Sequence, residues 1–338
     1  MNRWILIVVP SIFLFGFGAA ELSQTRVEIK YPTNWPKPNY DFETKPLTKE
    51  RIELGRKLFY DPFLSANGMV SCASCHLSFT AFTHVDHALS HGINDSIGTR
   101  NSPVLINLAW NNLFMWDGAV NNIEVQALAP ISHASEMGNN LVTLIPNLNN
   151  HNTYPALFRN AFGKEKITSK QLLLAIAQFQ LTLVSANSKY DKVKAGELKF
   201  TDQEANGYRL FQQNCDGCHA EPLFTNTAFE SNGLQPDITL NDSGRYHVTR
   251  LSKDLFRFKV PTLRNIQYSF PYMHDGRYNN LNEVLNHYRA KQNQQIINHQ
   301  NKPVIEITEN EKVDIIAFLL TLSDKEFLFN PDYGFPRN

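Results

Sequence analysis

The chain has 338 residues, which is enough for one large domain or two ordinary ones. Its apolar fraction of 42% is typical of a globular protein, and 32 lysines and arginines balance 32 aspartates and glutamates. A net charge of zero gives no reason to expect nucleic acid or an acidic membrane as a partner, so motifs must indicate the function.

The N-terminal segment has the pattern of a secretory signal. Arg3 precedes an apolar run over residues 4–17, and the small residues Gly18–Ala20 then precede the polar Glu21. The run is shorter than the ~20 residues that a membrane-spanning helix needs, which favours a cleaved signal peptide over a membrane anchor. We therefore expect a signal peptide over residues 1–20, an extension over residues 21–46 and a periplasmic protein that does not span the membrane.

The first predicted helix begins at Thr48 and ends in the sequence Gly55–Phe59, of the form Gly-x-[Lys/Arg]-Leu-Phe. The same form closes a second predicted helix at Gly207–Phe211. This second helix begins at Thr201, and Glu204 completes a capping box with that threonine. The two stretches predict an internal repeat of one structural unit.

Each repeat is followed by a Cys-x-x-Cys-His unit, and the two units contain all four cysteines. Two disulfides, a zinc ribbon or a thioredoxin-like redox pair would each use such cysteines, but none of them requires the histidine. Haem attachment does require it, because the thiols add to the porphyrin vinyl groups and the imidazole binds the iron. We therefore predict two covalently bound haem c groups, one at Cys72–Ala73–Ser74–Cys75–His76 and one at Cys215–Asp216–Gly217–Cys218–His219.

Between the two units, Gln171–Val184 is dense in apolar residues and predicts a long buried helix. Ser185–Lys199 is polar and predicts a linker near residues 190–200, and strand signals are sparse along the chain. The predicted fold is mainly α, with two tandem cytochrome c-like domains over residues 47–195 and 196–338, each holding a haem c.

The last informative helix follows the second unit. Leu281, Val284, Leu285 and Tyr288 recur at the spacing of one helix face, so Tyr288 is expected to point inward. His287 is turned about 100° away from that face. From spacing alone, Tyr288 is either a core tyrosine or a ligand of the second haem.

Three further motifs join the haem units in a resemblance to the bacterial di-haem cytochrome c peroxidase family, which includes the methylamine-utilisation (MauG-type) enzymes. They are Arg100–Asn101–Ser102–Pro103, Phe114–Met115–Trp116–Asp117–Gly118 and Pro271–Tyr272–Met273–His274–Asp275–Gly276. The resemblance runs from about Thr48 to near Leu320. It implies that hydrogen peroxide is reduced to water at the first haem with electrons that arrive through the second.

The resemblance also implies roles around the first haem. Splitting a peroxide requires a proton to move from one oxygen to the other, and Glu136 falls at the family's position for that acid–base group. Gln126 would donate a hydrogen bond to the peroxide, Trp116 would relay electrons between the haems, and Pro130 shares the family spacing. Without the resemblance, Glu136 would be interpreted as a surface carboxylate, Gln126 as a solvated amide and Trp116 as a core tryptophan.

The sixth ligand of the second haem separates the branches of the family. Its position falls on Tyr288 here, where the peroxidase branch has methionine and the MauG-type branch has tyrosine. Met273 is the alternative ligand, although it lies in a loop where the family ligand does not. A thioether favours ferrous iron, whereas a phenolate favours ferric iron and higher oxidation states.

The same resemblance implies an inter-haem calcium ion. Asn101 and the backbone carbonyls of Ser269 and Pro271 match the family's ligands, and oxygen ligands suit calcium. The other interpretation of Asn101 is a turn residue before Pro103.

Two positions depart from the family. Many of its peroxidases cap the first haem at rest with a loop histidine, whose position falls here on Ile93, so we predict a first haem open to peroxide without reductive activation. His91 is the nearest imidazole, and His84 and His87 are further residues that would have to shift in. The MauG-type enzyme that matures a protein tryptophan cofactor has a tryptophan where this chain has Gln213.

These expectations leave three functions. The leading one is a periplasmic di-haem peroxidase that accepts electrons from a small cytochrome or cupredoxin. The second is a MauG-type oxidase that modifies a protein substrate, and the third is a non-catalytic di-haem electron carrier. The sequence leaves the oligomeric state open, with a homodimer as one choice.

Overall fold

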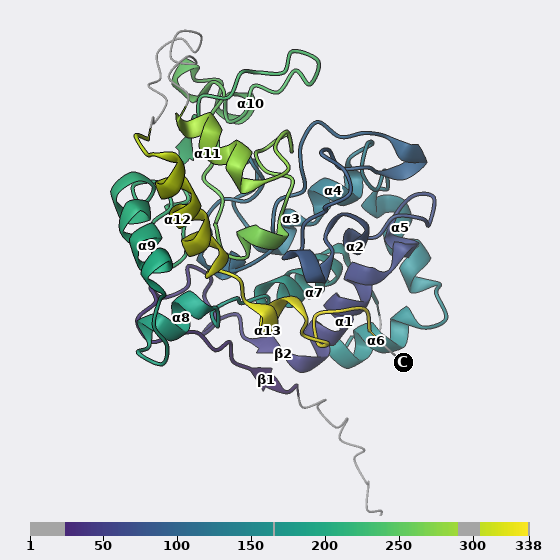
Figure 1. The fold of residues 1–338 in the computed structure, drawn as a ribbon. Coiled ribbons are helices and arrows are strands. Elements are labelled where there is room, and N and C mark those ends of the chain that lie inside the picture. Colours follow the sequence, from purple (N-terminus) through teal and green to yellow (C-terminus); the bar gives the residue numbers. More distant parts are fainter. Residues whose placement is uncertain (1–23, 165, 290–304, 337–338) are drawn as a thin grey trace, which may run out of the picture.

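A computed structural model describes residues 24–164, 166–289 and 305–336. Within these ranges the protein is mainly helical, and its four strands of two residues each form two small antiparallel sheets (Figure 1). No helix in these ranges is long and apolar enough to cross a membrane. The expected signal peptide lies outside the described residues.

The helices of the first half of the chain (residues 47–195) are α1 (Lys49–Tyr60), α2 (Cys72–Cys75), α3 (Ile123–Gln126), α4 (Leu128–Ser132), α5 (Leu141–Asn149), α6 (Tyr154–Phe162), α7 (Ser169–Leu181) and α8 (Lys189–Lys194). Those of the second half (residues 196–338) are α9 (Asp202–Asn214), α10 (Tyr246–Thr249), α11 (Leu281–Arg289), α12 (Glu309–Leu320) and α13 (Lys325–Leu328). Strand β1 (Arg26–Val27) pairs with β2 (Leu47–Thr48), and β3 (Phe229–Glu230) pairs with β4 (Phe258–Lys259).

A tight helix pair forms the frame of each half. A Cβ atom added to Gly55 in α1 would lie 1.9 Å from the carbonyl oxygen of Ala175 in α7, and one added to Gly207 in α9 would lie 1.9 Å from that of Asp314 in α12. Only glycine allows so close a crossing. Figure 1 shows α9 beside α12 and α1 beside α7. The predicted internal repeat is therefore also a repeat in the structure.

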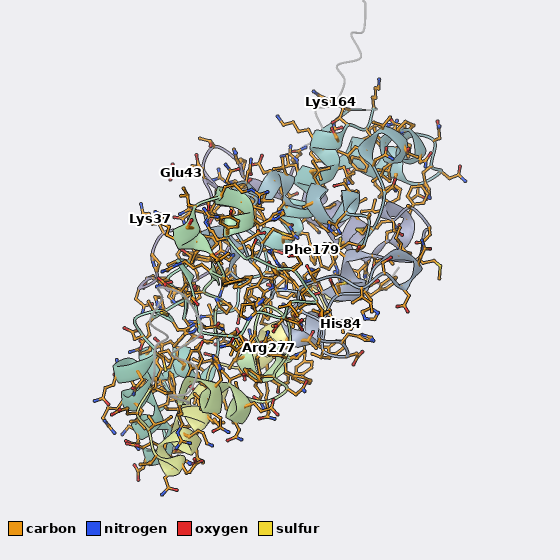
Figure 2. All side chains as sticks on the ribbon, turned by 90° about the horizontal axis from the view of Figure 1, so that it is seen from above. Lys37, Glu43, His84, Lys164, Phe179 and Arg277 are labelled. Carbon is orange, nitrogen blue, oxygen red and sulfur yellow. The ribbon has the colours of Figure 1, made fainter. Side chains whose placement is uncertain are left out.

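The local predictions for these helices are confirmed. Thr201 and Glu204 form the expected capping box at the start of α9. Helix α7 is buried along nearly all of its length, as predicted for Gln171–Val184, and Figure 2 shows its Phe179 among densely packed side chains. The expected linker contains α8, which anchors to the second half because its Asp191 pairs with the fully buried Arg264 at 2.8 Å.

The repeat extends beyond the helix pairs. Asn101–Pro130 and Lys259–Tyr288 align without insertion or deletion, and each contains an Asp-Gly turn. Matching residues have the same left-handed backbone conformation: Asn107 and Asn265, Met115 and Met273, and Gly118 and Gly276. Each half therefore carries the same scaffold next to its haem unit.

The two halves are joined by a buried polar junction built from matching residues. Asn107 Oδ1 accepts a hydrogen bond from the backbone N–H of Ser185 at 3.0 Å, and Asn265 Oδ1 accepts one from that of Asp324 at 2.7 Å. The Ser185 hydroxyl then donates to Asp324 Oδ2 at 3.1 Å. These bonds fix how the two scaffolds face each other.

Candidate functional site

The first Cys-x-x-Cys-His unit lies on the single turn of α2, which Ser71 caps at its N-terminus. His76 follows the turn, and its Nδ1 lies 2.6 Å from the carbonyl oxygen of Phe82. Burial lowers the pKa of His76 to about 4, so the imidazole is neutral. A neutral ring held at Nδ1 offers its Nε2 to a metal.

All four cysteines are free thiols, so the two disulfides weighed from the sequence are not formed. Burial raises the pKa of Cys72 and Cys215 to about 12 and that of Cys75 to about 11. In the described part of the chain, no three His, Cys, Asp or Glu side chains converge on a point that would hold a metal ion. The thiols are therefore placed for covalent attachment rather than for a zinc ribbon.

The second unit opens onto a large cavity. Its His219 has Nδ1 3.1 Å from the carbonyl oxygen of Pro261 and 3.3 Å from that of Phe224, and burial lowers its pKa. Cys215, Cys218 and His219 all line a cavity of about 470 Å³ whose walls are mostly apolar. Two thiols and a neutral imidazole in an apolar cavity fit a covalently bound haem.

Residues of the first half line the same cavity. Trp116 and Gln126 are among them, whereas Cys72–His76 and Glu136 are not. The Trp116 indole donates to the carbonyl oxygen of Asn101 at 2.8 Å, and its own carbonyl oxygen accepts from the backbone N–H of Lys259 at 2.7 Å. Trp116 is thus held between the two halves, where the predicted relay would need it.

In each half, a side-chain amide donates a hydrogen bond to the sulfur of a methionine. Gln126 Nε2 donates to Met115 Sδ at 3.3 Å, and Asn232 Nδ2 donates to Met273 Sδ at 3.2 Å. Sulfur is a weak acceptor, so each amide can exchange this bond for a stronger one to a ligand. The Gln126 amide therefore remains available to an oxygen ligand.

Glu136 lies beside the first haem unit. Its carboxylate contributes to the raised pKa of the Cys72 and Cys75 thiols. Burial raises the pKa of Glu136 itself, and His133 Nδ1 lies 3.9 Å from its Oε1. A carboxyl that keeps its proton to higher pH is suited to donate that proton in a reaction.

The loop that would carry a capping histidine presents Ile93 instead. The backbone N–H of Ile93 donates to the Glu136 carbonyl oxygen at 2.7 Å. His91 is bonded to Asp95 at 2.9 Å, and its ring packs against that of His87 at 4.2 Å. The nearest imidazole is therefore engaged within its own loop.

The two candidates for the sixth ligand of the second haem lie together. Tyr288 and Met273 both line the cavity, and Asn232 is hydrogen-bonded to each of them. Burial raises the pKa of Tyr288, whereas His287 is bonded to the Asn232 carbonyl oxygen at 2.9 Å and is not part of the lining. The orientation expected for the helix face is confirmed, and the choice between Tyr288 and Met273 stays a prediction.

The alignment of the two halves shows which residue of the first half corresponds to Tyr288. Tyr288 in the second half corresponds to Pro130 in the first. Proline has no side-chain atom that can bind iron, so the first half has no protein ligand at the matching place. This difference agrees with a closed second site and an open first one.

The residues expected to bind calcium also meet in the cavity. Asn101, Ser269 and Pro271 all line it, although they come from opposite halves. The buried Asn101 donates from Nδ2 to the carbonyl oxygen of Ala88 at 2.9 Å, which leaves its Oδ1 to face other partners. The oxygen donors fit a calcium ion, and the site itself stays a prediction.

Two functional features were missed from the sequence. Arg100 donates to Asp117 at 2.8 Å and in a bidentate pair to Asp242 at 2.7 and 2.8 Å, and these carboxylates raise its pKa. This cluster ties the two halves together, but Asp242 lies in a segment without a recognisable motif. Lys259 was also missed, although its alignment with Asn101 could have located it.

Comparisons with known proteins agree with the two-part organisation of the chain. The family model for di-haem cytochrome c peroxidase matches residues 49–199, and the model for cytochrome c matches residues 204–323. The chain is 34% identical to the methylamine utilization protein MauG of Methylorubrum extorquens over 89% of this chain and 85% of that protein. It is 33% identical to the cytochrome c551 peroxidase of Nitrosomonas europaea over 86% and 84% of the two chains. The crystal structure of a MauG-like protein associated with microbial copper homeostasis is 29% identical, covers 92% of this chain and 99% of its own, and superimposes with a TM-score of 0.80.

Proposed function

Because the chain belongs to the family of di-haem cytochrome c peroxidases, oxidoreductases that act on peroxide, we propose that it reduces hydrogen peroxide at the His76 haem with electrons delivered through the His219 haem. The observation that carries the proposal is the difference between the aligned halves. Pro130 aligns with Tyr288, which lines the cavity, so proline would leave the first iron open at the place where tyrosine would close the second. An electron carrier would be expected to close both irons.

The chemistry divides between the cofactor and the chain. Bound haem would supply the iron at which peroxide binds and would pass on to the peroxide the electrons of the external donor. Burial raises the pKa of Glu136, so its carboxyl keeps a proton to higher pH than an ordinary glutamate and would transfer it through a carboxyl oxygen to the departing oxygen of the peroxide. Gln126 orients the peroxide once its amide leaves the Met115 sulfur.

The chain also positions an electron path. Trp116 is held by Asn101 through its indole N–H and by Lys259 through its carbonyl oxygen, so its ring has a fixed place at the cavity between the halves. On the other side of the cavity, Tyr288 would cap the second haem, with Met273 as the alternative. A calcium ion at Asn101, Ser269 and Pro271 would add positive charge to the same region.

The partners follow from this assignment. A small cytochrome or cupredoxin would supply the electrons, and a periplasmic location would suit both that donor and the predicted signal peptide. The engaged His91 and the backbone bond of Ile93 to Glu136 support a first haem that needs no reductive activation.

A second candidate is a MauG-type oxidase that acts on a protein. Tyr288 favours it, because tyrosine is the ligand of that branch, and the identity to MauG of Methylorubrum extorquens points the same way. Gln213 in place of the branch's tryptophan argues against the particular substrate of that enzyme.

The deciding experiment measures peroxide-dependent oxidation of reduced cytochrome c by the purified di-haem protein. The peroxidase predicts turnover that Glu136→Gln lowers by about 10²- to 10⁴-fold, the usual contribution of an acid–base group. Glu53→Gln, at an exposed glutamate of α1, is the control and should leave turnover unchanged. Absence of turnover in the wild type, with one high-spin and one low-spin ferric haem by electron paramagnetic resonance, would favour the protein-modifying oxidase, and two low-spin haems would favour the carrier.

A further inference from the structure

Lys259 in β4 is a partly buried cation that no carboxylate of the described residues neutralises. It lines the large cavity, and its ammonium donates a hydrogen bond to the carbonyl oxygen of Leu113 at 3.0 Å. Burial alone lowers its pKa to about 8, with no charged partner contributing. An ammonium group that faces a mostly apolar cavity with one neutral partner is costly, which indicates that an anion from outside the chain completes the site.

The other charges around the cavity are already paired. Among the described residues that line it, Lys259 is the only lysine or arginine and Glu230 is the only carboxylate. Glu230 is paired with Arg257 at 2.6 Å, and Arg100, which bonds the neighbouring turn, is paired with Asp117 and Asp242. The cavity thus offers one free cationic group to an anionic ligand.

The aligned repeat gives this lysine a counterpart. The backbone N–H of Lys259 donates to the carbonyl oxygen of Trp116 at 2.7 Å. In the other half, the backbone N–H of Asn101 donates to the carbonyl oxygen of His274, also at 2.7 Å. Lys259 matches Asn101 and Trp116 matches His274 in the alignment, so the two bonds are the same bond made twice.

The side chains continue this correspondence. Leu113, whose carbonyl oxygen accepts from the Lys259 ammonium, aligns with Pro271, whose carbonyl oxygen is an expected calcium ligand beside Asn101. The Lys259 ammonium, bonded to Leu113, therefore lies at the position that corresponds to the expected calcium ion beside Asn101 and Pro271. Asn101 in one half is expected to bind a cation, and Lys259 at the matching position of the other half carries a positive charge itself.

We propose that the Lys259 ammonium is the built-in counterpart of the calcium ion and binds a haem propionate carboxylate beside Trp116. The calcium half of this statement rests on the proposed function, whereas the propionate contact does not. Each haem carries two propionates, and they are the anions that the cofactor itself brings into the cavity. A charge-assisted bond to a carboxylate would supply the partner that the chain lacks.

This contact would make Lys259 a positioning residue. Its ammonium fixes the carbonyl oxygen of Leu113, directly before Phe114–Gly118, and its backbone fixes Trp116 within that turn. A positive charge next to a haem favours the reduced state, because reduction lowers the charge at the iron. Loss of the charge is therefore expected to lower the midpoint potential of that haem.

The test compares Lys259→Met, which keeps the length and removes the charge, with Lys259→Arg, which keeps the charge. Resonance Raman spectra of the di-haem protein report the bending modes of the propionates, which shift with their hydrogen bonds. Lys259→Met should shift a propionate mode and lower one midpoint potential, and Lys259→Arg should restore both toward the wild type. Lys192→Met, at a surface lysine paired with Glu326, is the control. Unchanged modes and potentials in Lys259→Met would overturn the propionate contact, whether or not the protein turns over peroxide.

A second variant tests the correspondence with calcium. Lys259→Asn places the residue of the first half at the matching position, and it should raise the calcium measured per chain by one ion relative to the wild type. An unchanged calcium content would overturn the equivalence of the two sites. Absence of calcium from the wild type would contradict the calcium site and with it the pairing, and the Raman result would still decide the propionate contact.

Discussion

Asp324, at the junction of the two halves, should be among the most destabilising positions to mutate. Its side chain is 2% exposed. Oδ2 accepts from the Ser185 hydroxyl at 3.1 Å and from the backbone N–H groups of Ala186 and Asn187 at 3.0 and 2.9 Å. Oδ1 accepts from the N–H of Phe327 at 3.0 Å and so caps α13. Four donors, those of Ser185 and Phe327 buried and the other two part-buried, therefore depend on one carboxylate.

Asp324→Ala removes both acceptor oxygens and so all four hydrogen bonds at once. A lost helix cap costs about 1 kcal/mol, and a buried donor without its acceptor costs about 1–3 kcal/mol. Because these costs are not additive, we expect a total of about 3–5 kcal/mol, or a melting temperature lower by roughly 6–10 °C. Asp324→Asn keeps the shape and should lose about 1–2 kcal/mol.

Thermal unfolding of the di-haem protein, followed by circular dichroism, measures both losses. Asp332→Ala, at an exposed aspartate close in sequence, is the control and should change the melting temperature little. A loss in Asp324→Ala no larger than that of the control would refute the junction as a main source of stability.

Three further predictions test other parts of the structure. Arg264→Met leaves the buried Asp191 carboxylate without its cation and should cost about 3–5 kcal/mol in urea denaturation, and a loss under 1 kcal/mol would contradict this. Gly207→Ala places a methyl group 1.9 Å from the Asp314 carbonyl oxygen and should cost at least about 1–3 kcal/mol by thermal unfolding, because α9 and α12 must separate. Burial raises the folded-state pKa of Glu136, so the wild type should lose stability relative to Glu136→Gln as pH rises from the ordinary glutamate pKa, about 4.3, through the raised value. Urea midpoints of the two proteins at pH 4 and pH 8 measure this change, and an equal difference at both pH values would contradict it.

The sequence predicted the helical frame and the haem units because these depend on local patterns. The capping box of Thr201 and Glu204 and the apolar run of α7 are signals that neighbouring residues carry. The Cys-x-x-Cys-His spacing is likewise local, because both thiols and the imidazole must reach one cofactor.

The contacts between the halves could not be predicted in the same way. Arg100 and Asp242 are far apart in the sequence, and nothing near Asp242 marks it as the partner of an arginine. Helix α8 was expected as a linker because its surface is polar, although Tyr190 and Asp191 anchor it to the second half. Long-range pairing of polar groups leaves no periodic signal.

The origin of the site is best understood from where the two matching scaffolds differ. Both halves retain the glycine crossing, the Asp-Gly turn and the left-handed methionine, and these set the backbone around each haem unit. Pro130 is aligned with Tyr288, and this one difference would decide which iron can bind peroxide. Asn101 is likewise aligned with Lys259. This pair would decide whether the positive charge near each haem unit is a bound ion or a lysine side chain. Exchanging Pro130 and Tyr288 should therefore change the ligation of the two irons, and exchanging Asn101 and Lys259 should change the charge beside them. The helix pairs that form the frame of each half should remain folded in both cases. The residues that determine function would then be distinct from those that stabilise the duplicated fold.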